Sequence, residues 1–123
     1  MQLSIKTQKS NLPLEGEVEA ITGALKQKSE TKLTMPFRFT QDGKGFEAHR
    51  DYPNKPIEAK DELFRDAQVI LHRPFTEQEN AGGFDASVLE NQPCRIVVLN
   101  KRTAGGKHVP VVTTVLARKE ASN

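Results

Sequence analysis

Strict alternation of apolar and polar residues over positions 33–40 is the feature that most limits how this chain can fold. The apolar members are Leu33, Met35, Phe37 and Phe39, and the polar or breaking members are Thr34, Pro36, Arg38 and Thr40. A period of two is the signature of a strand with one buried face, so Phe37 and Phe39 are expected in a core. Because Pro36 has no N–H to donate, it predicts an edge strand or a bulge at that point.

The other segments predict further strands and a single long helix. Residues 16–25 suit a strand with a bulge or bend at Gly23, with a helix as the alternative. The turn signal Asp42-Gly43-Lys44-Gly45 predicts a return strand over 46–52, and the apolar runs 94–100 and 109–116 predict two more. Apolar residues with helical spacing predict a helix over about residues 57–72, namely Leu63, Phe64, Ala67, Ile70 and Leu71. A polar connection over 74–83 leads to a short helical turn over 84–89 started by Asp85.

The order of these elements predicts a mainly β fold, a five-stranded OB-like Greek-key barrel with one helix between strands 3 and 4. Such barrels bind oligonucleotides or oligosaccharides through the face of strands 2 and 3 and the loops joining strands 1 to 2 and 4 to 5. With 123 residues, the chain has room for one domain. We place that domain at residues 14–118, after a flexible arm or edge strand over 1–13 and before a short disordered tail over 119–123.

Positive charge is concentrated where an anionic partner could reach it, although the net charge is only +2. Residues 95–119 contain six Lys or Arg and no Asp or Glu, whereas 74–94 contain four acidic residues and no Lys or Arg. Both loops that bind ligands in OB-like barrels are basic here, at 26–32 and 101–107. The predicted phosphate contacts are Lys26, Lys28, Lys32, Arg38, Lys101, Arg102 and Lys107, with Arg50 and Arg95 as further candidates on the barrel face.

Aromatic rings for base stacking are scarce, since the chain has six Phe, one Tyr and no Trp. Phe64 lies on the apolar face of the predicted helix and is expected in the core with Phe37 and Phe39. We predict that Tyr52 is the best stacking residue, because its ring can stack while its hydroxyl stays in water, and packing at the barrel end is the alternative. Phe46, Phe75 and Phe84 are the remaining possible stacking residues.

Two segments resemble phage and plasmid single-stranded-DNA-binding proteins of the OB-fold type. Residues 91–100 (NQPCRIVVLN), the basic glycine-containing turn and residues 109–116 (VPVVTTVL) resemble their carboxy-terminal half, and residues 14–20 (LEGEVEA) resemble their opening strand. Gln92 and Val18 differ from the Gly and the aromatic residue usual in that group. The resemblance implies a sequence-tolerant binder of single-stranded DNA, acting in phage or plasmid DNA replication or recombination.

The sequence offers little for other functions. A lone Cys94 and three His without metal-ligand spacing favour neither disulfides nor a metal, and no catalysis and no cofactor are expected. The absence of a signal peptide and of a long apolar run predicts a soluble, cytoplasmic protein without a membrane partner. The alternative function is a protein-interaction module that binds a host factor through the acidic 77–90 segment or a strand edge. The sequence leaves the oligomeric state open, with a homodimer as one possibility, and leaves RNA open as the ligand.

Overall fold

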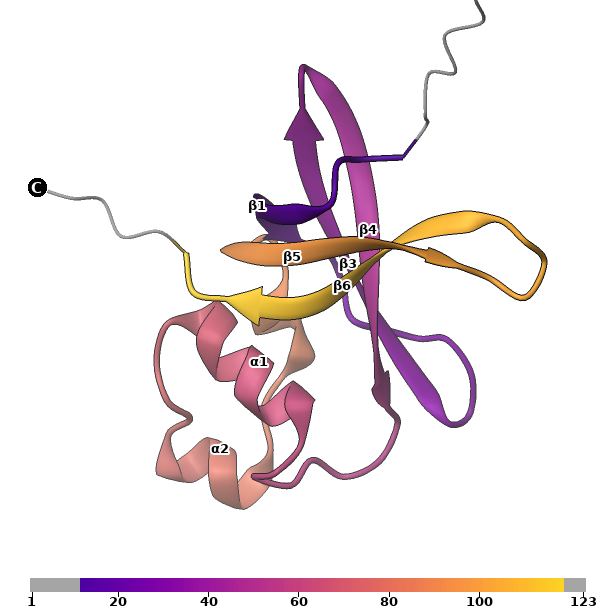
Figure 1. The fold of residues 1–123 in the computed structure, drawn as a ribbon. Coiled ribbons are helices and arrows are strands. Elements are labelled where there is room, and N and C mark those ends of the chain that lie inside the picture. Colours follow the sequence, from indigo (N-terminus) through magenta and orange to yellow (C-terminus); the bar gives the residue numbers. More distant parts are fainter. Residues whose placement is uncertain (1–11, 119–123) are drawn as a thin grey trace, which may run out of the picture.

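A computed structural model describes residues 12–118, and it shows a mainly β protein built around a closed barrel (Figure 1). The strands are β1 (Gly16–Thr22), β2 (Lys26–Gln27), β3 (Lys32–Gln41), β4 (Lys44–Pro53), β5 (Pro93–Arg102) and β6 (His108–Leu116). The helices are α1 (Glu62–Leu71), α2 (Glu77–Gly82) and the short 3-10 helix η1 (Ala86–Leu89). Residues 119–123 and most of the predicted arm over 1–13 lie outside the described residues.

Five strands close the barrel, and the sixth extends it. The sheet order is β1-β5-β6-β4-β3-β2, and an additional pairing of β1 with β3 closes the ring around the first five strands of that order. All pairings are antiparallel except that of β4 with β6, so the barrel is mixed. This architecture fits the OB-like barrel predicted from the sequence.

The helices follow the fourth strand, whereas the sequence predicted one helix between strands 3 and 4. The number of strands before the helices differs by one because β2 was not predicted from the sequence. This strand has two residues and pairs Lys26 with Thr34 and Gln27 with Leu33. So short a pairing has no periodic signature. The sequence also did not predict α2, which lies in the supposed polar connection over 74–83.

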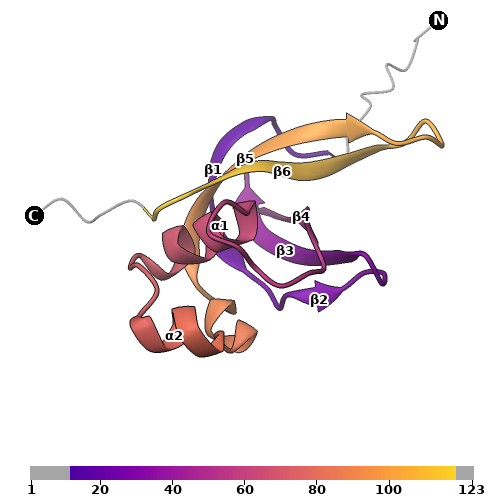
Figure 2. The same ribbon diagram turned by 90° about the horizontal axis from the view of Figure 1, so that it is seen from below.

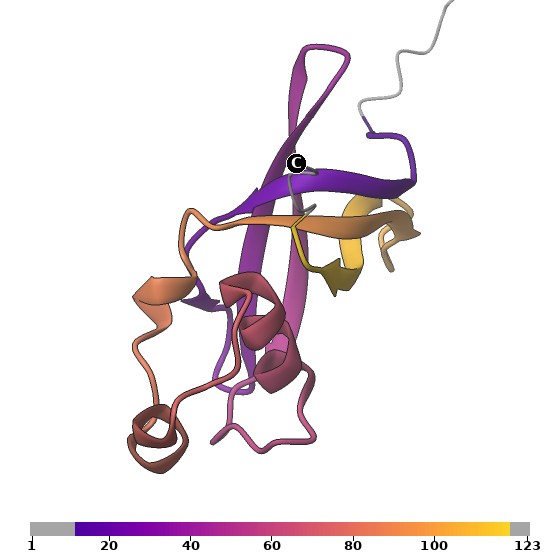
Figure 3. The same ribbon diagram turned by 90° about the vertical axis from the view of Figure 1, so that its left-hand side faces the viewer.

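The core confirms the period-two pattern of β3. Met35, Phe37 and Phe39 are buried, and the helix supplies Leu63, Ala67 and Ile70 from its apolar face. Phe64 and Leu71 are partly buried and pack against this core. In Figures 1 and 3, α1 lies across the lower end of the barrel, with α2 farther out.

Pro36 lies in a central strand, contrary to the expectation of an edge strand. β4 pairs with β3 along its whole length, and on the other side β3 pairs first with β2 and then with β1. The Pro36 carbonyl accepts from the Gly23 N–H, at the point where the partner changes from β2 to β1. Because N–H and C=O of one strand residue point to the same side, the missing N–H faces this break rather than β4.

Two hairpins extend beyond the barrel. The β3–β4 hairpin turns tightly at Asp42 and Gly43, both with positive φ of 51° and 76°, as a two-residue hairpin turn requires. The β5–β6 hairpin pairs outward as far as Arg102 and His108. Both strands are therefore longer than the predicted 94–100 and 109–116, and this hairpin projects from the barrel as an arm (Figure 2).

Candidate nucleic-acid interface

The tip of the β5–β6 arm carries three cations and no carboxylate within residues 101–107. Lys101 and Arg102 were predicted in a loop but belong to β5, and the turn itself covers 103–107. The Thr103 N–H donates to the Lys107 carbonyl at 2.7 Å, and the Gly106 N–H donates to the Thr103 carbonyl at 2.9 Å. Gly106 has a φ of +82°, which glycine adopts without strain. An ordered turn therefore presents Lys107 to solvent beside the two strand cations.

The second predicted loop brings three lysines to one outer face. The β2–β3 register continues outward through a hydrogen bond from the Lys28 N–H to the Lys32 carbonyl. Side chains two residues apart share a face, so Lys26, Lys28 and Lys32 lie on the same side of the sheet. All three are exposed.

Asp51 lies among these lysines and compensates part of their charge. The Lys28 ammonium is 2.8 Å from the Asp51 carboxylate. Partial burial acts to raise the pKa of Asp51, but hydrogen bonds from Lys28 and Thr34 and the charges of Lys28 and Lys32 outweigh it and hold that pKa below its usual range. Asp51 is therefore ionised at neutral pH, and among the described residues Lys28 is the one lysine of the three that forms an ion pair with a carboxylate.

The two basic loops project from the same side of the molecule. The turn between β2 and β3 and the tip of the β5–β6 arm both point to the right in Figure 1 and again in Figure 2. The outer face of β4 lies between them, because β4 pairs with β3 on one side and with β6 through His49 and Val111 on the other. The structure thus brings to one side the two segments that carry six of the predicted cations, namely Lys26, Lys28, Lys32, Lys101, Arg102 and Lys107.

Arg38 and Arg95 are held by groups outside the two basic loops. Arg38 is exposed beside β1 and donates to the Asn91 side chain at 3.1 Å. Arg95 donates to the Ala117 carbonyl at 2.8 Å and pairs with Glu17 at 3.3 Å. Neither guanidinium adds to the charge of the two loops.

Arg50 and Tyr52 point into the protein, which corrects the prediction that they contact nucleic acid. Tyr52 is 1% exposed, and its hydroxyl donates to Asp66 at 2.7 Å. The Arg50 guanidinium lies 3.0 Å from Asp66 and 2.9 Å from Glu62, with its centre 5.7 Å from the Tyr52 ring. Burial, followed by the negative charge of Asp66, raises the pKa of Tyr52 far above its ordinary value. The Tyr52 ring offers no surface on which a base could stack.

The other aromatic residues are also engaged within the fold. Phe75 is buried, and its ring centre lies 5.0 Å from that of Phe64 and 4.8 Å from that of Phe84. Phe46 is half-buried against Phe39, with the Lys44 ammonium 5.3 Å from its ring centre. Of the predicted stacking residues Phe46, Phe75 and Phe84, only Phe46 lies on a strand, and it is half-buried there.

A feature that sequence reasoning missed is the exposed apolar surface of the arm. Leu99 is 44% exposed and Val109 is 39% exposed, although both lie in the apolar runs that predicted the last two strands. The alternation of side chains between the two faces of β5 could have predicted that Leu99 is exposed. Ile96 and Val98 face the core, so Leu99 must face outward.

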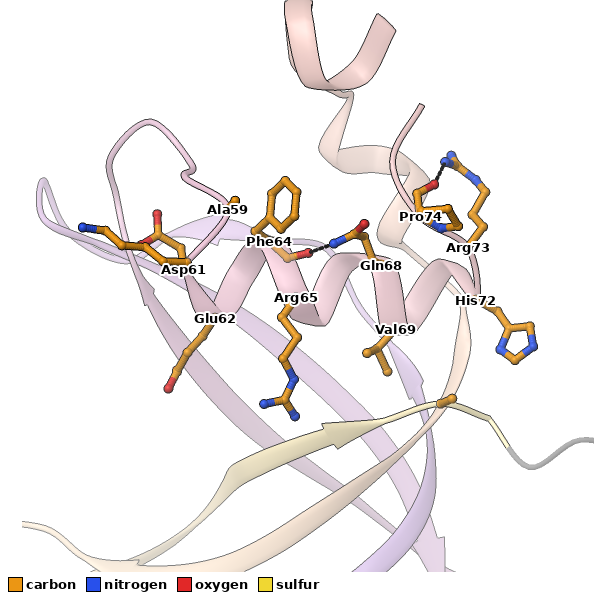
Figure 4. A pocket seen from close by; sticks show the side chains of 12 residues that line it. Ala59, Asp61, Glu62, Phe64, Arg65, Gln68, Val69, His72, Arg73 and Pro74 are labelled. Carbon is orange, nitrogen blue, oxygen red and sulfur yellow. Dashed lines mark hydrogen bonds between the residues drawn. The ribbon is translucent and has the colours of Figure 1, made fainter. Parts of the chain in front are cut away.

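A surface hollow of about 750 Å³ follows the outside of α1. Figure 4 shows that its side chains do not converge, since Glu62, Arg65 and Val69 point to one side of the helix and Phe64 and Gln68 to the other. Gln68 is used internally, donating to the Phe64 carbonyl and accepting from the Phe75 N–H. We assign no ligand to this hollow.

Among the described residues, neither the cysteine nor the His, Asp and Glu side chains form a reactive or metal-binding group. Burial, with a smaller contribution from Asp66, raises the pKa of Cys94 to about 12, so its thiol is protonated and unreactive. Over residues 12–118 no group of His, Cys, Asp and Glu is arranged to hold a metal ion. Within the same range, no helix is both long enough and apolar enough to cross a membrane.

Comparison with known proteins gives no relative from which a function could be transferred, because no protein-family model and no curated protein matches this chain.

Proposed function

We propose that this protein binds single-stranded DNA without sequence preference, through the side of the barrel that carries its two basic loops. The observation that supports it best is that the two segments with six exposed cations, three around the β2–β3 turn and three on the β5–β6 arm, project toward one side of the molecule. A surface that tracks phosphates needs this kind of distributed positive charge.

The OB-type interpretation supports the same proposal. With the two-residue β2 set aside, the chain order is three strands, the helices and two strands, and we infer a Greek-key barrel of the OB type. Its two ligand-binding loops would then be the turn after β1 and the β5–β6 tip. A role in phage or plasmid DNA replication or recombination follows only from the sequence resemblance and belongs to the same proposal, as does RNA as the alternative ligand.

The alternative, a protein-interaction module acting through residues 77–90, has less support from the geometry. Glu79 pairs with Arg73 at 2.7 Å and caps α2 together with Thr76. Asp85 caps η1 by accepting from the Ser87 N–H. Glu79 and Asp85 therefore stabilise local structure, although Asp85 is exposed like Glu77 and Glu90.

The proposal is tested by the salt dependence of binding in a variant that lacks the arm cations. Replacing Lys101, Arg102 and Lys107 together by Ala should lower the slope of log affinity against log salt by about two, because each single-strand phosphate contact contributes roughly 0.7. The matched control removes three exposed cations elsewhere, Lys44, Lys60 and Arg65. An equal loss of slope in both variants would show that net charge alone governs binding, and an unchanged slope in the arm variant would remove the arm from the site.

A further inference from the structure

One face of the β5–β6 arm combines apolar side chains with positive charge. The register pairs Leu99 with Val111 and Lys101 with Val109, so these four side chains share the outer face of the hairpin. Leu99 and Val109 are both well exposed, and Val111 is half-buried. Val111 also pairs with His49 of β4, which joins this face to the side between the two basic loops.

The arm carries no carboxylate of its own. Residues 99–111 include Lys101, Arg102, Lys107 and His108 and neither Asp nor Glu. Glu15 lies at the base of the arm, where its carboxylate accepts the Asn100 N–H at 2.8 Å. The Asn100 side chain donates to the Pro13 carbonyl at 2.8 Å, so the base of the arm is anchored to the segment before β1.

This combination of charge and apolar surface selects the partner. A second copy of the arm would bring like charges together, which opposes self-association through this face. A duplex presents phosphates but keeps its base faces stacked inside. A single strand presents both phosphates and unpaired base faces, and thus matches both properties of the arm.

We infer that the arm binds unpaired bases on its Leu99 and Val109 face while Lys101 and the cations at the tip contact the flanking phosphates. This inference rests on the proposed function and supplies the base-contact surface that the buried Tyr52 cannot provide. Aliphatic side chains make no hydrogen bonds, so the contact cannot distinguish base edges and offers no partner to a 2′-hydroxyl. Binding through this face is therefore tolerant of sequence and accepts DNA and RNA alike.

The test is a double variant, Leu99→Thr with Val109→Thr, which keeps strand-forming residues and every cation. Its affinity for a 30-nucleotide oligo-dT at fixed salt should fall roughly tenfold, from the lost burial of apolar groups. The salt slope should stay that of the wild type, since no phosphate contact is removed. The matched control is Ile57→Thr with Val88→Thr, which changes two apolar residues of similar exposure elsewhere and should bind as the wild type. Circular dichroism melting verifies that both variants are folded.

The other outcomes separate this inference from the proposed function. Wild-type binding with an unaffected double variant would overturn the inference and leave the proposed function standing, whereas no wild-type binding to oligo-dT would remove both. If sedimentation showed that the wild-type protein alone is a dimer and that the double variant is a monomer, this face would be an interface between copies. Binding to vesicles of equal phosphatidylcholine and phosphatidylserine that requires Leu99 and Val109, without binding to oligo-dT, would assign the face to a lipid surface. Either result overturns the inference.

Discussion

The Tyr52 hydroxyl donates a 2.7 Å hydrogen bond to the buried carboxylate of Asp66, which ties β4 to α1 inside the core. Burial raises the pKa of Asp66, while the bond from Tyr52 and the charge of Arg50 act in the opposite direction. The pair therefore belongs to the structural part of the protein, on the far side of the barrel wall from the proposed interface.

Replacing Tyr52 by Phe should lower the free energy of unfolding by about 1 to 3 kcal/mol, because Asp66 loses a buried hydrogen-bond donor. Urea denaturation measures this change. The folded variant should bind oligo-dT with wild-type affinity, since the ring does not reach the surface. A variant of wild-type stability that binds weakly would instead return Tyr52 to the interface.

Replacing Asp51 by Asn should strengthen binding to a single strand. The substitution removes the carboxylate that pairs with Lys28 and frees that ammonium for a phosphate, so the salt slope should increase by about 0.7. Fluorescence anisotropy at four salt concentrations gives the slope. The control is Glu58→Gln, which removes a carboxylate paired with Lys60 outside the proposed interface. Weaker binding by the Asp51 variant would contradict the placement of the β2–β3 lysines in the site.

Gly23 should tolerate no side chain. A Cβ at this position would lie 2.6 Å from the Pro36 Cγ, and the Gly23 N–H already donates to the Pro36 carbonyl at 2.7 Å. Gly23→Ala must therefore separate the end of β1 from β3, at a cost of about 1 to 3 kcal/mol typical of overpacking. Gly45→Ala is the control, because its Cβ meets no atom within 4 Å. Equal melting temperatures for the two variants would contradict this close approach.

Acid should weaken the fold partly through Glu79. The hydrogen bond from Arg73, followed by that from the Thr76 backbone, lowers the pKa of Glu79 from 4.5 to about 2. A depressed carboxyl pKa gives stability that is fully present above the unfolded value and is lost as pH falls from 4.5 toward 2. Glu79→Gln should make the free energy of unfolding less dependent on pH in that window, as measured by urea titrations at several pH values. An unchanged dependence would show that Glu79 is not coupled to folding.

Local periodicity was sufficient to predict most of the barrel. Parity placed Phe37 and Phe39 in the core, and Asp85 marked the start of η1 as expected. The helix begins at Glu62 rather than near residue 57, because the Asp61 side chain accepts the Glu58 N–H in the preceding turn. That turn leaves no periodic trace in the sequence.

The candidate site was harder to predict, because it depends on which side of a strand each residue faces. Tyr52 and Arg50 share the parity of Ala48, which is buried, so β4 itself indicated that they point inward. Their partner Asp66 lies on the apolar face of α1, where a carboxylate needs a buried partner. The projection of the two basic loops from one side, in contrast, arises from barrel closure and has no signal in the linear sequence.

The central claim, that this protein binds single strands through charge and unpaired bases, is tested most directly by fluorescence anisotropy of a labelled 30-nucleotide oligo-dT. The oligonucleotide is titrated with wild-type protein at low and at physiological salt, beside a duplex of the same length. We predict binding that weakens steeply with salt and that favours the single strand over the duplex at both salt concentrations. Absence of binding at low salt would contradict the account, as would equal affinity for the duplex.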